Sequence, residues 1–334
     1  MTIRHSLTFI AAAVLTGIST LFPITQLHAQ PLDTIRAAAE EGDAAAQFNL
    51  GFMYANGDGV PPSDTQAVRW YSLAAAQGYA AAQFNLGRMC AMGDGIPLDD
   101  TEAARWFTLA AEQGVAIAQF NLGRMYEQGL GLPLDYAEAM RWYRLAADQT
   151  HAAAQFNLGL VYANGNGVPR DDAEAARWFN LAAEQGMAIA QFNLGLMYDE
   201  GLGLPQDYAE AVRWYRLAAE QGHAAARLNL GLMYDEGQGI PQDDAEAVRW
   251  YRLAAEQGHA AAQFNLGLMY AEGEGVSQDD VEAHTAFDLA AALSSGGDRE
   301  RFIRARDAVA ARMTAEQIAE AQRRVQEWTP TPGF

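Results

Sequence analysis

The sequence predicts an all-α protein, an α-solenoid of seven 36-residue helix-turn-helix repeats with capping helices at both ends. Two strings support this: an Ala-Gln-Phe-Asn-Leu-Gly string recurs every 36 residues, and an Arg-Trp-aromatic string follows it at a fixed distance in six copies. A period of roughly 20–50 residues indicates a solenoid or a propeller, and the helical spacing of the apolar residues favours the solenoid. The first string begins at residues 46, 82, 118, 154, 190 and 262, and a variant, Ala-Arg-Leu-Asn-Leu-Gly, fills 226–231.

Residues 1–29 are predicted to be a secretory signal peptide. Arg4 and His5 precede an apolar run from Leu7 to Phe22, and a short polar stretch leads to an expected cleavage site after Ala29. The run has 16 residues, fewer than the ~20 that span a bilayer, so cleavage is favoured over the alternative of an uncleaved anchor. We therefore expect a periplasmic or secreted protein.

Residues 30–42 are predicted to form an N-terminal capping helix. They align with a lone second helix of the repeat, since Ile35 falls in the register of Tyr71, and Ala38 in that of Ala74. A solenoid needs such a cap because its first repeat has no neighbour to cover it.

Residues 43–294 contain the seven repeats, of which 43–78 is typical. Ala46, Leu50 and Met53 recur at i, i+4 and i+7, which predicts an amphipathic first helix. Gly57 provides a left-handed stop, and Pro61 prevents the helix from continuing.

The second helix of each copy is predicted to begin with a capping box, in which an N-cap side chain is followed three residues later by Glu or Gln. It ends at a closing glycine such as Gly78. The predicted boxes are Ser63 with Gln66, Asp99 with Glu102, Asp135 with Glu138, Asp171 with Glu174, Asp207 with Glu210, Asp243 with Glu246 and Asp279 with Glu282.

Residues 295–334 are predicted to add C-terminal capping helices and a short tail. The helices are expected over Asp298–Arg312 and Thr314–Trp328, and the second begins with a Thr314–Gln317 capping box. The Pro-rich end, Thr329–Phe334, is expected to be a tail.

The composition excludes several chemistries. The formal net charge is −20, and all 22 basic residues are arginine. Without lysine there is no P-loop, no Ser-x-x-Lys acylase and no Schiff-base amine. A strongly negative chain is also repelled by nucleic acid and by anionic lipid, so we expect neither as a partner.

These strings resemble the Sel1-like repeat family, a relative of the tetratricopeptide repeats. The matching elements are Ala-x-x-x-Leu-Gly-x-x-Tyr, Gly-x-Gly-Val-Pro and Ala-x-x-Trp-Tyr-x-x-Ala-Ala-x-x-Gly. The resemblance implies a right-handed superhelix that serves as an adaptor or scaffold. The chain departs from the pattern at Thr150, which replaces a closing glycine, at Ser277, which replaces the loop proline, and in the seventh copy, which lacks its tryptophan.

The resemblance also places the first helices on a concave groove that can hold a peptide or a helix. One asparagine per copy would lie near this groove, and three residues beyond it lies a register that varies between copies. In this register arginines would bind acidic groups and leucines would bind apolar anchors. The candidate partner-binding residues are Asn85, Asn121, Asn157, Asn193, Arg88, Arg124, Leu160 and Leu196.

A structural interpretation of these residues stays open beside the functional one. An asparagine present in every copy can satisfy a neighbouring helix end, and a leucine can fill the interface between repeats. The tryptophan of each second helix is interpreted as core rather than as a binding platform, because a buried ring removes a large apolar area from water.

We expect no enzyme activity, no cofactor and no metal site. His151, His223 and His259 share one register and are therefore spread along the array, whereas zinc needs three or four converging ligands. Cys90 stands where other copies carry tyrosine and is interpreted as a buried substitute, with a redox or intermolecular role as the alternative.

The sequence therefore favours a non-enzymatic adaptor or scaffold in the bacterial cell envelope that binds a protein or peptide, with regulation of a periplasmic signalling complex as one duty. The alternatives are an envelope hydrolase of the β-lactam or peptidoglycan type, and a secreted factor that acts on a host. No membrane insertion is expected after signal cleavage, and the sequence leaves the oligomeric state open.

Overall fold

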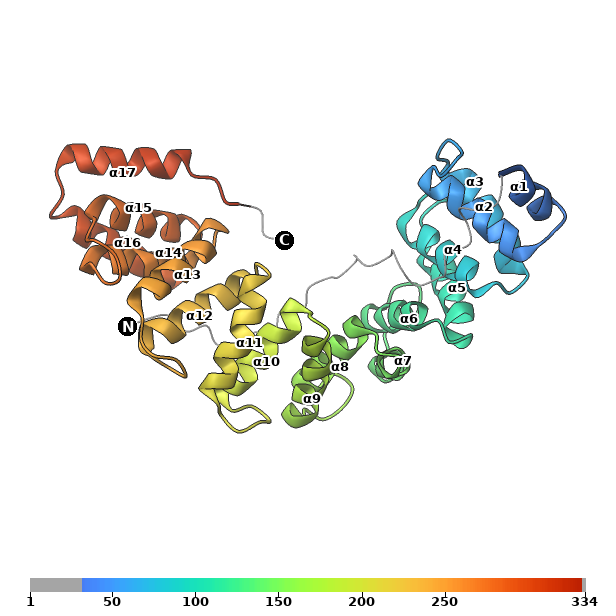
Figure 1. Ribbon diagram of the computed structural model, residues 1–334, viewed down its shortest axis with the longest axis horizontal. Helices are drawn as coiled ribbons and strands as arrows, with labels where there is room; N and C mark the ends of the chain where they lie inside the picture. Colours follow the sequence, from blue (N-terminus) through green and yellow to red (C-terminus); the bar gives the residue numbers. More distant parts are fainter. Residues whose placement is uncertain (1–31, 332–334) are drawn as a thin grey trace. The chain divides into compact units, whose positions relative to one another are not determined.

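The computed structural model describes residues 32–331, so the predicted signal peptide and the cleavage site after Ala29 lie outside the described residues. Between residues 32 and 331 the chain forms 17 α-helices and no β-strand (Figure 1). The all-α prediction is confirmed. The helices divide between two compact units, and the boundary along the chain falls between Asp171 and Asp172.

The first unit, residues 32–171, holds eight helices. The helices are α1 (Leu32–Glu40), α2 (Ala44–Asn56), α3 (Asp64–Ala76), α4 (Ala80–Met92), α5 (Asp100–Glu112), α6 (Ala116–Gln128), α7 (Tyr136–Asp148) and α8 (Ala152–Asn164). From α1 to α8 each helix packs on the one before it, so that α4, for example, contacts α5 of its own repeat and α3 of the preceding repeat.

The second unit, residues 172–331, holds nine helices, and α9 to α16 follow the same packing order. They are α9 (Asp172–Glu184), α10 (Ala188–Glu200), α11 (Tyr208–Glu220), α12 (Ala224–Glu236), α13 (Asp244–Glu256), α14 (Ala260–Glu272), α15 (Asp280–Ala292), α16 (Gly296–Ala310) and α17 (Ala315–Glu327).

The predicted capping boxes of the second helices form only in part. The Asp99 carboxylate accepts a hydrogen bond from the Glu102 N–H at 3.0 Å, as expected. The reciprocal bond does not form, because the Asp99 N–H already donates to the Cys90 carbonyl at 3.0 Å. Glu102 instead accepts from Arg105 at 2.7 Å, and a charge-assisted bond of this kind is stronger than one to a neutral N–H.

Positive φ angles stand where the helix stops were predicted. Gly57 ends α2 with a φ of 77°, and its N–H donates to the Met53 carbonyl. In the closing register of the second helices Gly78 has a φ of 84° and Thr150 one of 63°, the only positive φ outside glycine among the described residues. Thr150 therefore adopts the left-handed conformation of the closing glycine that it replaces.

The core forms between successive helices from the repeated aromatic residues. Trp142 of α7 and Phe107 of α5 belong to one buried cluster with Leu122 and Met125 of α6. The tryptophans at 70, 142, 178, 214 and 250 are buried, and Trp106 is partly buried. The interpretation of the tryptophan register as core is confirmed.

The C-terminal helices cover the last repeat. Phe302 of α16 stacks on Phe264 of α14 with ring centroids 4.7 Å apart, and the Arg306 guanidinium donates to the Asp288 carboxylate of α15 at 2.8 Å. At the start of α17 the Thr314 capping box closes in both directions. Beyond α17 the chain returns to the preceding repeat, where the Thr331 N–H donates to the Glu256 carbonyl at 2.7 Å.

Candidate partner-binding surface

The asparagines of the first helices turn toward the second helix of the preceding repeat. Burial raises the pKa of Tyr71 well above its ordinary value, and the nearby Arg88 guanidinium and Asn85 amide partly offset that rise. Asn157 has the same relation to Tyr143. These two amides therefore serve the packing between repeats.

Where the second helix carries phenylalanine, the next asparagine has no hydroxyl to bind. Asn121, which follows Phe107, instead donates to the Ile117 carbonyl of its own helix at 2.8 Å. Asn193 follows Phe179 and donates to the Ile189 carbonyl at 2.7 Å, a second case of the same substitution. The repeated amide is thus used inside the fold in both kinds of copy.

Three of the predicted groove residues are buried. Asn193 is 0% exposed, Leu160 is 7% exposed and Leu196 is 6% exposed. Leu196 belongs to the core cluster that contains Val212 and Tyr215 of α11, because its register faces the second helix of its own repeat. The prediction that these three residues contact a partner is therefore corrected: they are core residues.

The arginines that precede the tryptophans on the second helices also have partners within the fold. The Arg141 Nε donates to the Glu138 carboxylate at 2.9 Å, and its guanidinium lies 4.1 Å from the centroid of the Trp142 ring. Arg105, Arg177 and Arg213 make the same pair of contacts. Arg249 makes the same ring contact with Trp250 and a longer ion pair with Glu246, at 3.8 Å.

Arg88 and Arg124, on the first helices α4 and α6, remain candidates. The Arg88 Nη1 lies 3.7 Å from the Asp94 carboxylate, and its side chain is 27% exposed. The Arg124 guanidinium forms no ion pair or hydrogen bond with any residue between 32 and 331. It lies near the Tyr143 hydroxyl, whose pKa it lowers slightly against the larger raising effects of burial and of Glu127. Asn85, Asn121 and Asn157 are partly exposed beside these arginines, so their predicted role stays a prediction.

Four exposed apolar residues at the loops of the second and third repeats were not predicted from the sequence. Two of them, Leu98 and Leu134, share a register that holds a polar residue in all later copies, so a comparison of that register between copies would have found them. The four residues are Met92, Leu98, Leu130 and Leu134.

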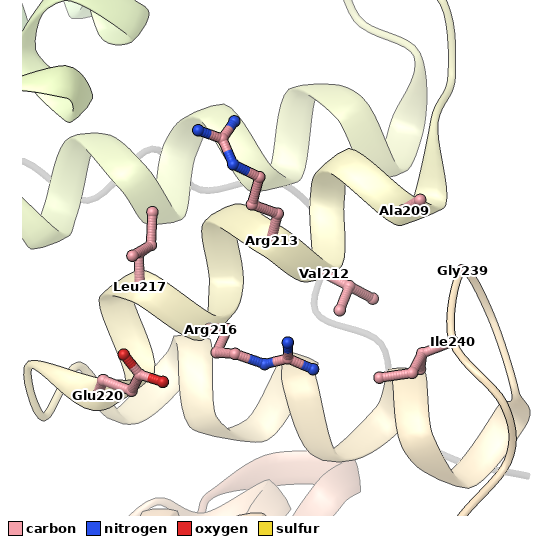
Figure 2. A pocket seen from close by; sticks show the side chains of 8 residues that line it. All are labelled: Ala209, Val212, Arg213, Arg216, Leu217, Glu220, Gly239 and Ile240. Atoms are coloured by element: carbon pink, nitrogen blue, oxygen red, sulfur yellow. The ribbon is translucent and has the colours of Figure 1, made fainter.

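A hollow of about 490 Å³ lies on α11 beside the loop that follows α12. Figure 2 shows the Arg216 guanidinium extending along α11 toward Ile240. Arg216 donates to the Tyr234 hydroxyl at 3.0 Å, and the corresponding arginines of α7 and α13 do the same with Tyr162 and Tyr270. The lining consists of two arginines, one glutamate and apolar residues, with no hydroxyl, thiol or imidazole side chain.

No group of three or more potential metal ligands occurs between residues 32 and 331. Over the same range, none of the helices has both the length and the apolar character needed to cross a membrane.

The sequence profile of the Sel1 repeat matches seven consecutive segments, at residues 44–79, 80–115, 116–151, 152–187, 188–223, 224–259 and 260–295. The chain belongs to the Sel1 repeat family. The resemblance seen in the sequence is confirmed, and with it the solenoid class of the fold. Sel1 repeat proteins are generally protein-interaction scaffolds.

Two solved structures are similar to this Sel1 repeat protein. A Sel1 repeat protein from Oxalobacter formigenes is 32% identical with a TM-score of 0.62, and the match covers 77% of this chain and 98% of that chain. A protective antigen of uropathogenic Escherichia coli strains, described as an SLR fold, is 30% identical with a TM-score of 0.55, and the match covers 89% of this chain and 86% of that chain. Among curated proteins, none matches the chain.

Proposed function

We propose that this Sel1 repeat protein is a non-enzymatic adaptor or scaffold that binds protein or peptide partners in the bacterial cell envelope, where it regulates a periplasmic signalling complex. One observation carries the proposal: the recurring amides of Asn121 and Asn193 have hydrogen-bond partners inside the fold, whereas Arg124, whose register varies between copies, forms no ion pair with any described residue. A surface that differs from the repeat pattern is where a repeat protein distinguishes its partner from others.

The envelope location rests on the order of charged, apolar and polar segments in residues 1–29. If the segment is removed after Ala29, the exported protein begins at Gln30. Its intact mass, measured on protein recovered from the periplasm, tests this assignment. A mass that includes residues 1–29 would contradict it.

Affinity capture from a periplasmic extract tests the binding function. Amine-reactive crosslinkers would find only the N-terminal amine, since the chain has no lysine, so capture is done natively or with a photo-crosslinker. The bait is the wild type, with an Arg88→Glu, Arg124→Glu double variant beside it. We expect one partner that the wild type retains and the equally folded double variant loses.

The envelope hydrolase alternative predicts a different result. Purified protein would then hydrolyse nitrocefin or muropeptides, and the turnover would survive extensive purification. That outcome, together with the failure to capture a partner, would overturn the adaptor proposal.

One finding favours a second candidate, the secreted host-interaction factor. A similar structure belongs to a protein described as a protective antigen of a uropathogen. This candidate shares the binding chemistry and differs in location, so recovery of the protein from culture medium rather than from periplasm would favour it.

A further inference from the structure

The second and third repeats expose apolar side chains at the loop between their two helices. Met92, Leu98, Leu130 and Leu134 are four of the eight strongly exposed large apolar residues in the described chain, and Leu98 and Leu134 are 63% and 56% exposed. The register of Leu98 and Leu134 is polar in all later copies, where it holds Arg170, Gln206, Gln242 and Gln278.

The loop does not need leucine to fold. In the second repeat Gly93 and Gly95 have φ angles of 76° and 68°, and in the sixth repeat Gly237 and Gly239 have 66° and 69°. The sixth repeat forms this turn with Gln242 in the leucine register. Because the same turn forms with a polar residue, the exposed leucines are not explained by loop stability.

The loops of the second and third repeats lie against each other. A Cβ atom at Gly131 would collide with the backbone of Asp100, so the third loop packs on the first residue of α5. Asp100 is two residues beyond Leu98, and Gly131 directly follows Leu130. The loops that carry the exposed apolar residues of the two repeats therefore adjoin each other.

The same two repeats carry the first-helix arginines, and Arg88 reaches one of the apolar residues. Its Nη1 lies 3.6 Å from the Met92 sulfur, and its Nε is buried with no hydrogen-bond partner. In the later copies the arginine register holds Leu160, Leu196, Leu232 and Leu268. The chain thus departs from its repeat pattern in two registers at once, and in the same two copies.

The carboxylate of Glu127, which like Arg124 lies near the Tyr143 hydroxyl, already has a partner there. It accepts a hydrogen bond from that hydroxyl at 2.6 Å. A partly buried guanidinium that lacks a counter-ion favours an anionic group from outside.

We propose that this surface docks a protein segment that carries large apolar side chains together with at least one carboxylate for Arg124. This rests on the proposed adaptor function and names the chemistry of its partner. An anionic membrane fits less well, since the surface is flanked by Asp94, Asp99 and Asp100 on a chain of net charge −20. We call the surface the loop patch, and its residues are Arg88, Met92, Leu98, Arg124, Leu130 and Leu134.

A displayed library of random peptides, selected on the full chain, supplies the probe for a test. We expect the selected peptides to share a carboxylate and two or more large apolar residues. Their affinity is then measured by fluorescence polarisation against the wild type and a Leu98→Gln, Arg124→Leu, Leu134→Gln variant. These replacements are the chain's own residues at the same registers in other copies, so the variant is expected to fold, and we expect it to bind at least tenfold more weakly.

A Gln206→Ala, Gln242→Ala variant, altered in the same loop register of the fifth and sixth repeats, is the matched control and should bind as the wild type does. Equal affinity of the selected peptides for all three proteins, with unchanged melting temperatures, would overturn the loop patch while leaving the adaptor function standing. Selection of no peptide, or sedimentation with phosphatidylglycerol vesicles that the triple variant loses, would also overturn the proposal, the latter in favour of a membrane surface.

Discussion

Two histidines cap first helices in a register that holds an aspartate in the first repeat. The Nδ1 atoms of His151 and His223 accept the Ala154 and Ala226 N–H groups, each at 3.2 Å. Each ring stacks on a phenylalanine of the preceding repeat, with centroids 4.6 Å apart for His223. The sequence predicted that these histidines are dispersed along the array, but a cap made by a neutral imidazole could not be foreseen because it depends on that stacked position.

Burial lowers the pKa of His223 to about 4, from 6.5 in an unfolded chain. Between these values the unfolded chain binds more protons, so the free energy of unfolding falls as the pH falls from 6.5 toward 4. His223→Asn keeps a capping acceptor without a titrating group. Urea unfolding should show a pH dependence in this window shallower than that of the wild type by up to about 1.4 kcal/mol per pH unit. An unchanged dependence would mean that the folded chain protonates His223 as readily as the unfolded one.

Thr150 is strained because a β-branched side chain occupies the left-handed region. Thr150→Gly should raise the free energy of unfolding by about 1 kcal/mol, the relief of strain being partly offset by the greater freedom of glycine in the unfolded chain. Gly186→Thr, in the same register with a φ of 87°, is the reverse experiment and should destabilise. Thermal melts of both variants check this, and a destabilising Thr150→Gly would be the contrary result.

At the scale of elements, the first helix approaches the second helix of its repeat at a glycine, as at Gly87, Gly123, Gly195 and Gly231. A Cβ atom at Gly231 of α12 would lie 2.7 Å from the ring of Tyr251 on α13. Gly231→Ala should therefore destabilise by about 1–3 kcal/mol. Gly297→Ala in α16 is the control, since nothing lies within 4 Å of its Cβ position and alanine is the better helix former. Equal melting temperatures for the two variants would contradict the close approach.

The tryptophan register joins a second helix to the first helix of its own repeat and to the preceding repeat. Trp142 packs with Leu122 and Met125 of α6 and is 6% exposed. Trp142→Ala should lower the free energy of unfolding by ~3–5 kcal/mol, which denaturant unfolding would measure. A melt little changed by the substitution would show that the ring is not core.

Most elements could be predicted because their signals are local and repeated. The glycine stop at Gly57 and the cap at Asp99 lie within a few residues of the ends they define. The absence of the second capping-box bond, from the N-cap N–H to the glutamate side chain, could not be predicted in this way. It depends on the Asp99 N–H bonding to Cys90 across the loop, a contact that no short sequence window contains.

At the scale of the molecule, the candidate site was predicted only in part. Arg88 and Arg124 were found because they vary between copies, and variation is visible in one sequence. The burial of Leu160 and Leu196 could not be seen, because a register that faces solvent in one solenoid faces a neighbouring helix in another. The exposed Leu98 and the other apolar loop residues lie outside the two repeated strings. The binding residues were predicted from those strings, so the loop residues were not among them.

The central claim is that the residues repeated in each copy build the fold, whereas the residues that differ from the repeat pattern bind the partner. Amide hydrogen exchange of the full chain, with and without a peptide selected on it, tests this claim most directly. The account predicts slowed exchange over residues 88–98 and 124–134, with the loops at 201–207 and 237–243 unchanged. Protection confined to those later loops, or spread evenly along the first helices, would contradict it.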